Sequence, residues 1–201
     1  MSRVRFFLRD QRATSAVEFA LVVPLMLLFL LGIIDVGRFI WNLNQAEKAT
    51  QIGARWAVVT DMVPSGLANY SFATSGGVAQ GTVVPKALFP GITCTSTGCV
   101  CKTGGTCNFG TNRNADAFNR LVGRMNQIYG GIGSANVTVD YDWSGLGYAG
   151  DPTGPDVAPL VTVRTTGLQF RPTFLANIFD FGLPDLSYTL TMEDGQGTFA
   201  N

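Results

Sequence analysis

Three groups of residues in this chain have types and spacings that could support chemistry: a lone carboxylate in an apolar run, four clustered cysteines and a spaced set of acids. The chain contains no histidine, which excludes histidine-based triads, histidine general bases and the commonest transition-metal ligand. It also lacks Walker A and G-x-S-x-G motifs. We therefore expect that the chain is not an enzyme and that it carries no cofactor or metal.

The lone carboxylate is Glu18, the one charged residue in an apolar run of nineteen residues from Ala16 to Ile34. A helix of that length spans roughly 28 Å, close to the thickness of bilayer hydrocarbon. A carboxylate costs roughly 2.5–3.5 kcal/mol at the centre of a membrane and less near its surface. Such a residue suggests a function. The alternative is that Glu18 reaches water or pairs with Arg12 or a lipid amine.

The four cysteines lie close together with the spacing C-x4-C-x-C-x5-C, which differs from the paired C-x2-C of structural zinc sites. An even number in an exported segment predicts two disulfides. A bridge between Cys99 and Cys101 would close a very small ring. Two connectivities stay open, Cys94–Cys99 with Cys101–Cys107 or Cys94–Cys101 with Cys99–Cys107.

The third group, Asp140, Asp142, Ser144 and Asp151, has the spacing of a calcium loop, with Gly145 at the sixth position. The final position carries Asp where such loops usually carry Glu, and a strand precedes the loop where a helix is usual. We favour the alternative, an acidic strand end that runs into a glycine-rich turn.

The charges around the apolar run predict its orientation. Arg3, Arg5, Arg9 and Arg12 precede it and face Asp10 alone, so the N-terminus is expected in the cytoplasm. The rest is then exported, which makes the chain a single-pass protein of the inner membrane with a periplasmic domain. The region beyond Gly130 is acidic, which argues against nucleic acid as a partner.

Helical periodicity continues past the apolar run, so we expect one helix from about Ser15 to Thr60. Asp35 and Arg38, three residues apart, can pair at the outer end of the span. The expected regions are a basic leader (1–13), a transmembrane helix (14–36), an amphipathic extension (37–60) and an exported domain (61–201). The side chains expected to pack the extension against other helices are Val36, Phe39, Ile40, Leu43, Ile52 and Trp56.

The exported domain has the pattern of an α+β fold. Residues 61–112 are rich in Gly, Ser, Thr and Pro and predict a long loop held by the cysteines. Ala115–Tyr129 has helical spacing and is followed by a Gly pair. Three alternating segments predict antiparallel strands. They comprise residues 137–143, 160–168 and 186–192.

The N-terminal sequence resembles a known family. The stretch RATSAVEFALVVPL at 12–25, GIIDVGR at 32–38 and A-x3-GAR at 49–55 are similar to the N-terminus of TadE/TadG-like pseudopilins, minor components of the tight-adherence (Flp-type) pilus. The match is dense over residues 12–60, whereas the later strands resemble the family only in outline. The resemblance implies a pilin-like fold and a role in pilus assembly, cell adhesion and secretion.

The resemblance also implies processing by a prepilin peptidase. Such enzymes cut five residues before a glutamate like Glu18, which places the cut between Ala13 and Thr14. The family most often has Gly where Ala13 stands, and Phe19 occupies the position of its usual aromatic residue. Cleavage would create an ammonium group at Thr14, and pairing of Glu18 with the ammonium of a neighbouring subunit would set the register of stacked helices.

The expected partners are accordingly other pilins and pseudopilins, the prepilin peptidase, the inner-membrane assembly platform and membrane lipid, with incorporation into an extracellular pilus one destination. The alternative function is a permanently anchored membrane protein that carries an exported, calcium-dependent binding domain. The pseudopilin function predicts cleavage and dependence on Glu18. The alternative predicts an uncleaved chain that tolerates a Glu18→Leu substitution.

Overall fold

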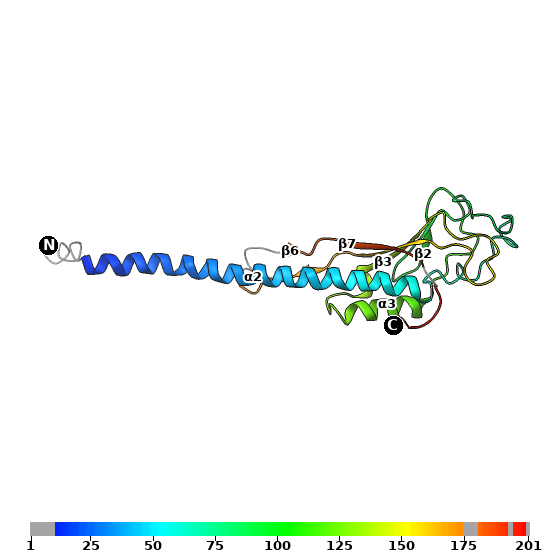
Figure 1. Cartoon of the computed structure of the whole chain (residues 1–201). Coiled ribbons are helices and arrows are strands. Elements are labelled where there is room, and N and C mark those ends of the chain that lie inside the picture. The colour runs from blue at the N-terminus through cyan, green and yellow to red at the C-terminus, as the bar shows by residue number, and fades with distance from the viewer. Residues whose placement is uncertain (1–10, 175–180, 193–194, 200–201) are drawn as a thin grey trace. The chain divides into compact units, whose positions relative to one another are not determined.

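The apolar N-terminal segment forms one long helix, α2 (Gln11–Val59), in a computed structural model that describes residues 11–174, 181–192 and 195–199. Figure 1 shows this helix in blue and cyan. The helix predicted from about Ser15 to Thr60 is confirmed, and the Thr60 amide still donates to the Trp56 carbonyl at 3.1 Å. Arg3, Arg5, Arg9 and Asp10 lie outside the described residues.

The described residues divide into two compact units. One holds α2 as far as Trp41 together with Phe170–Phe174, and the other holds Asn42–Gln169 and the residues from Gly182 onward. The last part of α2 therefore belongs to the same unit as the sheet. Phe170–Phe174, which the sequence placed in the exported domain, joins the unit of the apolar helix.

The second unit is built on a five-stranded antiparallel sheet with the order β2-β1-β3-β4-β7. The strands are β1 (Ile92–Cys94), β2 (Cys99–Cys101), β3 (Val137–Asp142), β4 (Leu160–Thr165) and β7 (Leu186–Thr191). The three predicted strands are thus confirmed, and the fold is α+β. A two-stranded sheet pairs β5 (Gln169–Phe170) with β6 (Phe181–Gly182), and η1 (Ser134–Asn136) is a short 3-10 turn.

The hairpin of β1 and β2 is a correction to the sequence analysis, which expected only a loop between residues 61 and 112. Both strands have three residues, too few to display the alternation by which a strand is predicted. Pairing brings Cys94 opposite Cys99 and places β1 beside β3. The cysteine-rich segment is therefore part of the sheet.

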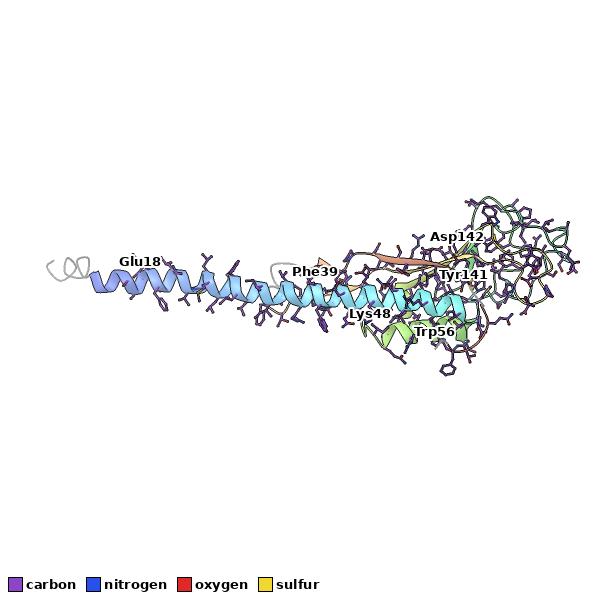
Figure 2. All side chains as sticks on the ribbon, viewed as in Figure 1. Glu18, Phe39, Lys48, Trp56, Tyr141 and Asp142 are labelled. Carbon is purple, nitrogen blue, oxygen red and sulfur yellow. A yellow bond between two sulfur atoms is a disulfide. The ribbon has the colours of Figure 1, made fainter. Side chains whose placement is uncertain are left out.

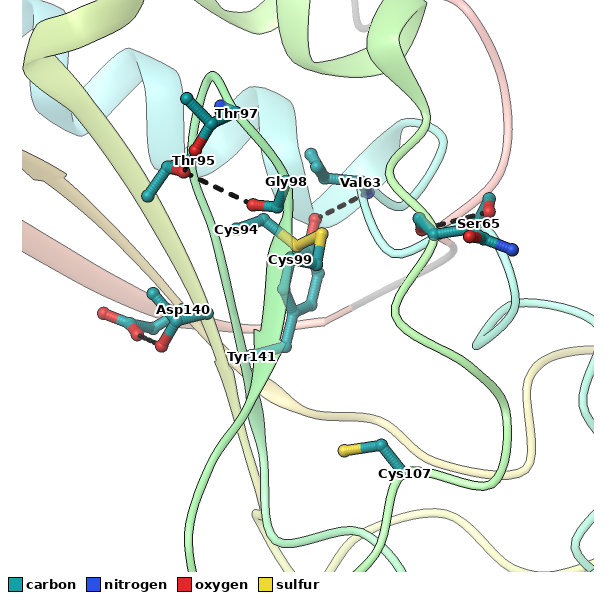
Figure 3. Close-up of a disulfide and its surroundings, with 12 residues drawn as sticks. Val63, Ser65, Cys94, Thr95, Thr97, Gly98, Cys99, Cys107, Asp140 and Tyr141 are labelled. Atoms are coloured by element: carbon teal, nitrogen blue, oxygen red, sulfur yellow. Dashed lines mark hydrogen bonds between the residues drawn. A yellow bond between two sulfur atoms is a disulfide. The ribbon is translucent and has the colours of Figure 1, made fainter.

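One face of the sheet forms the core. Val139 and Tyr141 of β3 lie opposite Val163 and Val161 of β4, and all four side chains are buried. The Tyr141 hydroxyl accepts a hydrogen bond from the Val63 amide at 3.0 Å, as Figure 3 shows. This bond supplies a partner for a backbone N–H group that is buried away from water.

Helix α3 (Ala115–Asn126) packs beside the C-terminal part of α2, where its Met125 lies against Gly53. Its first turn is capped by Asn114, whose Oδ1 accepts the Ala117 amide at 3.1 Å. The predicted helix ran to Tyr129, but α3 ends three residues earlier. The Asn126 side chain instead donates to the Ile132 carbonyl at 2.8 Å and so stabilises the turn that follows. Five apolar side chains of α3 are buried: Ala117, Phe118, Leu121, Val122 and Met125.

Candidate functional site

The apolar half of α2 is the first component of the candidate site. By length and composition, Ser15–Val59 is the one described helix that could cross a membrane, and none of its most apolar stretch is buried within the chain. This finding fits a single-pass membrane protein. The large apolar side chains exposed along it are Val17, Phe19, Leu21, Val22, Leu25, Met26, Leu27, Leu28, Phe29, Leu30, Ile33 and Ile34.

Glu18 lies near the N-terminal end of this helix, and its side chain is exposed (Figure 2). Ala13 and Thr14 have helical backbone, whereas their side chains lie outside the described part of the chain. Glu18 lies four positions after Thr14, which corresponds to about 6 Å along a helix axis. Phe19 is exposed beside Glu18. Cleavage between Ala13 and Thr14 stays a prediction.

Asp35 is the second component, and it lies directly after the apolar run. Its side chain is only 3% exposed. Asp35 Oδ1 accepts the Thr173 amide and Oδ2 accepts the Phe174 amide, both at 2.8 Å. The predicted pairing with Arg38 is present, with 3.4 Å between Arg38 Nη1 and Asp35 Oδ1. The carboxylate thus binds two backbone amides and one guanidinium group, which satisfies a buried charge.

Aromatic contacts reinforce this arrangement. The rings of Phe39 and Phe170 meet edge to face with 5.4 Å between their centroids. The Arg38 guanidinium carbon lies 5.8 Å from the centroid of the Phe170 ring, and Arg38 also donates to the Thr173 hydroxyl. We call Asp35, Arg38 and the backbone of Thr173 and Phe174 the Asp35 latch, because together they hold the Phe170–Phe174 segment on the helix.

The sequence analysis identified one half of this latch. It predicted the pair of Asp35 and Arg38 from their spacing. It did not identify Thr173 and Phe174, which contribute backbone amides and lie 138 and 139 positions further along the chain. The available signal was an acid directly after an apolar run, because such an acid requires hydrogen-bond donors when it is buried.

The six residues predicted to pack the helix against other subunits differ in exposure. Val36 and Ile40 are 56% and 51% exposed, whereas Phe39 is half-buried against Phe170. Leu43, Ile52 and Trp56 are half-buried too. The fully buried face of the helix carries mostly small residues and belongs to the second unit. It consists of Ala46, Ala49, Thr50, Gly53, Ala54, Ala57 and Val58.

This small-residue face contacts both the sheet and α3. The Thr50 hydroxyl donates to the Ala46 carbonyl at 2.9 Å and lies 2.8 Å from the Thr165 hydroxyl of β4. A Cβ atom added to Gly53 would stand 2.7 Å from the Met125 sulfur. The C-terminal part of α2 therefore packs within its own unit, which leaves Val36 and Ile40 as the predicted contact residues most available to another molecule.

The residues that match the calcium-loop spacing are engaged by other groups, in keeping with the acidic strand end favoured from the sequence. Lys102 Nζ lies 3.0 Å from Asp140 Oδ1 and 2.7 Å from Asp142 Oδ1. Ser144 donates to the Ala158 carbonyl at 2.6 Å, and Asp151 accepts the Thr153 amide at 2.9 Å. Across the residues that the structure describes, no three His, Cys, Asp or Glu side chains gather as a metal ion would require.

Asp140 is a charged centre on the polar face of the sheet. Its side chain is 5% exposed, and it accepts from Thr93 at 2.5 Å and from Arg164 Nε at 2.8 Å. Burial raises the pKa of Asp140, but hydrogen bonds from Thr93 and Lys102 and the charges of Lys102 and Arg164 outweigh it, so the pKa lies below its usual value. Burial lowers the pKa of Lys102, yet its bonds to Asp142 and Asp140 outweigh that effect, and the pKa is raised.

The four cysteines form the pairs Cys94–Cys99 and Cys101–Cys107, one of the two connectivities that the sequence left open. The first bridge joins the facing ends of β1 and β2, as Figure 3 shows, and its cysteines are buried. The second bridge is half-buried and ties β2 to the loop that follows it. The bridges covalently join β1 to β2 and β2 to the loop that follows it.

Residues 13–55 match the family model described as TadE-like protein. This range contains Glu18, the Asp35 end of the apolar run and the small-residue face as far as Arg55. The match confirms the resemblance seen at the N-terminus and associates the chain with the tight-adherence pilus system. No curated protein and no solved structure matches the chain.

Proposed function

We propose that this protein is a minor pseudopilin that takes part in assembling a tight-adherence pilus. The observation that carries the proposal is the TadE-like segment at residues 13–55, whose apolar helix exposes one carboxylate, Glu18, near its start. The segment supplies a membrane span and a surface for other helices. The role is structural: the protein acts by packing against partners.

Glu18 sets the register between subunits in this proposal. Cleavage between Ala13 and Thr14 removes the basic leader and leaves an ammonium group at Thr14. Within one helix the carboxylate lies about 6 Å along the axis from that ammonium. A neighbour displaced along the axis by this distance would bring its ammonium level with Glu18. Pairing removes the cost of an isolated charge in a medium of low dielectric constant.

The surface proposed to meet other pilins is the exposed apolar side of α2. It includes the side chains between Val17 and Ile34, and it extends outward to Val36 and Ile40. The buried Ala46–Val58 face is excluded because it packs within its own unit. The prepilin peptidase and the inner-membrane assembly platform are the further partners, and the second unit is placed in the periplasm, beyond the span.

A single substitution tests the role of Glu18. Glu18→Gln preserves the shape of the side chain and removes its charge. Loss of one partner from a buried ion pair costs about 3–5 kcal/mol, and 1.4 kcal/mol corresponds to a tenfold change. We therefore expect recovery of crosslinked pilin pairs from membranes to fall by about a hundredfold or more.

The matched control is Glu47→Gln, which removes an exposed glutamate further along the same helix. It should leave crosslinking unchanged. Glu18→Gln subunits that are processed normally and crosslink to pilins as the wild type does would refute the register role. A permanently anchored binding protein, the alternative function, predicts that result and also predicts an uncleaved chain.

A further inference from the structure

The Asp35 latch holds a second segment at a fixed position along the axis of the membrane helix. The apolar run ends at Ile34, and the carboxylate of the next residue binds the amides of Thr173 and Phe174. The backbone of these two residues is therefore held at the level of Asp35. Since the run has the length of the hydrocarbon layer, this level is the boundary between hydrocarbon and headgroups.

Apolar side chains remain exposed around this level. Phe174 is 48% exposed and Trp41 is 66% exposed, although both are large aromatic residues. Trp41 follows Asp35 by six residues, or about 9 Å along the axis, slightly more than the roughly 5–7.5 Å depth of one headgroup layer. Exposed aromatic residues are enriched in that layer.

Two cationic side chains accompany these aromatic residues. Arg38 lies one helical turn above Asp35, and Arg171 is exposed in the Phe170–Phe174 segment. Long basic side chains near the end of a span place their charge among the lipid phosphates while their stems cover apolar surface. The surface thus combines apolar contact, aromatic rings and positive charge, and it directly follows the exposed apolar run of α2.

We propose that Phe170–Phe174 forms a foot that lies in the membrane interface, in the leaflet on the side of the second unit, and that the Asp35 latch holds it there. Lipid is favoured over a partner subunit because the exposed side chains are centred on the hydrocarbon boundary and include two arginines. A contact with a neighbouring apolar helix would desolvate the exposed charge of Arg171. The inference rests on the membrane span and not on pilus assembly.

Depth-dependent quenching tests the foot. The full-length protein is reconstituted into bilayers of phosphatidylethanolamine and phosphatidylglycerol. All four native cysteines are bridged, so an environment-sensitive dye attaches only to a new cysteine. Phe174→Cys leaves the latch intact, because the latch uses the backbone amide of that residue. Lipids that carry a spin label near the headgroup should quench most of the dye emission at position 174.

Two further positions serve as controls. Val83→Cys, at an exposed site in the second unit, should give no quenching by any lipid label. Leu28→Cys, in the apolar run, should be quenched by labels deep in the acyl chains. Emission at 174 that no lipid label quenches, or that becomes protected only when another pilin is added, would overturn the foot. An unquenched dye at 28 would overturn the membrane span on which it rests.

The latch itself is tested by Asp35→Ala combined with the dye at position 174. Removal of both acceptor oxygens should cause the loss of most quenching at 174, while a dye at 28 remains quenched. The matched control is Asp185→Ala, which removes an exposed acid from the second unit and should change neither position. Full quenching at 174 in the Asp35→Ala protein would show that the latch does not hold the segment.

Discussion

The two disulfides give a prediction whose size follows from their loops. Cys94–Cys99 and Cys101–Cys107 close sequence separations of 5 and 6 residues. In the chain-entropy model, loops this short stabilise the folded state by about 2 kcal/mol each. For a domain of this size, 2 kcal/mol corresponds to roughly 4–8 °C in melting temperature. Cys101→Ala with Cys107→Ala should produce a loss of that size.

The other bridge should cost more to remove. Cys94 is fully buried and Cys99 nearly so, and they join the facing ends of the two strands in the hairpin. Loss of their buried sulfur atoms adds a packing penalty of about 1 kcal/mol per site to the entropic loss. We expect Cys94→Ala with Cys99→Ala to lower the melting temperature further than the first pair of substitutions does.

The assay is thermal unfolding of the detergent-solubilised full chain, with and without reductant. A labelling experiment checks the connectivity, because Cys94→Ala should leave Cys99 as the free thiol. A free Cys101 in that variant would establish the other connectivity. Equal melting temperatures for the wild type and both double variants would refute the assignment of a structural role to the bridges.

Two further predictions concern single positions in the second unit. Asp140→Asn should cost roughly 1–3 kcal/mol near neutral pH. Because the folded pKa of Asp140 is lowered, its contribution is complete above the unfolded value of about 3.9 and is lost as the pH falls through the folded pKa. Urea unfolding of the wild type should therefore weaken more steeply in acid than that of the variant, and parallel pH profiles would contradict this. Gly66→Ala should destabilise the protein because the new Cβ would stand 1.9 Å from the Phe109 carbonyl oxygen, whereas Gly123→Ala on an open face of α3 should stabilise it by about 0.5–1 kcal/mol. Equal unfolding midpoints for these two variants would refute the steric argument.

The elements with strong periodicity could be predicted from the sequence. The long helix, α3 and the strands β3, β4 and β7 all show apolar residues at helical or alternating positions, and each was found close to its expected range. The end of α3 was misplaced because the Asn126 side chain stabilises a turn that helical spacing does not reveal. The β1–β2 hairpin was missed because three-residue strands carry almost no periodicity.

The residues of the candidate site likewise comprise some that the sequence identified and some that it could not. Glu18 stands out in the sequence because a charge in an apolar run is expensive, and Asp35 paired with Arg38 at the expected spacing. The donors from Thr173 and Phe174 are backbone amides, which every residue but proline possesses, so nothing in their side chains could identify them. Long-range contacts of this kind can be identified only once the fold is known.

The calcium-loop spacing, for which the sequence analysis favoured an acidic strand end instead, shows how a sequence pattern can match without a site. Asp140 and Asp142 matched the pattern, yet both bind Lys102, which belongs to a segment about forty positions away. A pattern of oxygen ligands in sequence does not exclude a cation supplied by the chain itself. The ammonium group of Lys102 binds both carboxylates, and Arg164 supplies the second positive charge at Asp140.

The central claim, that this chain is processed and assembled as a pseudopilin, is tested most directly by the intact mass and N-terminal sequence of the protein from native membranes. We predict a chain that begins at Thr14. A chain that still carries residues 1–13 would contradict prepilin-type processing and would leave Glu18 without an ammonium partner at Thr14.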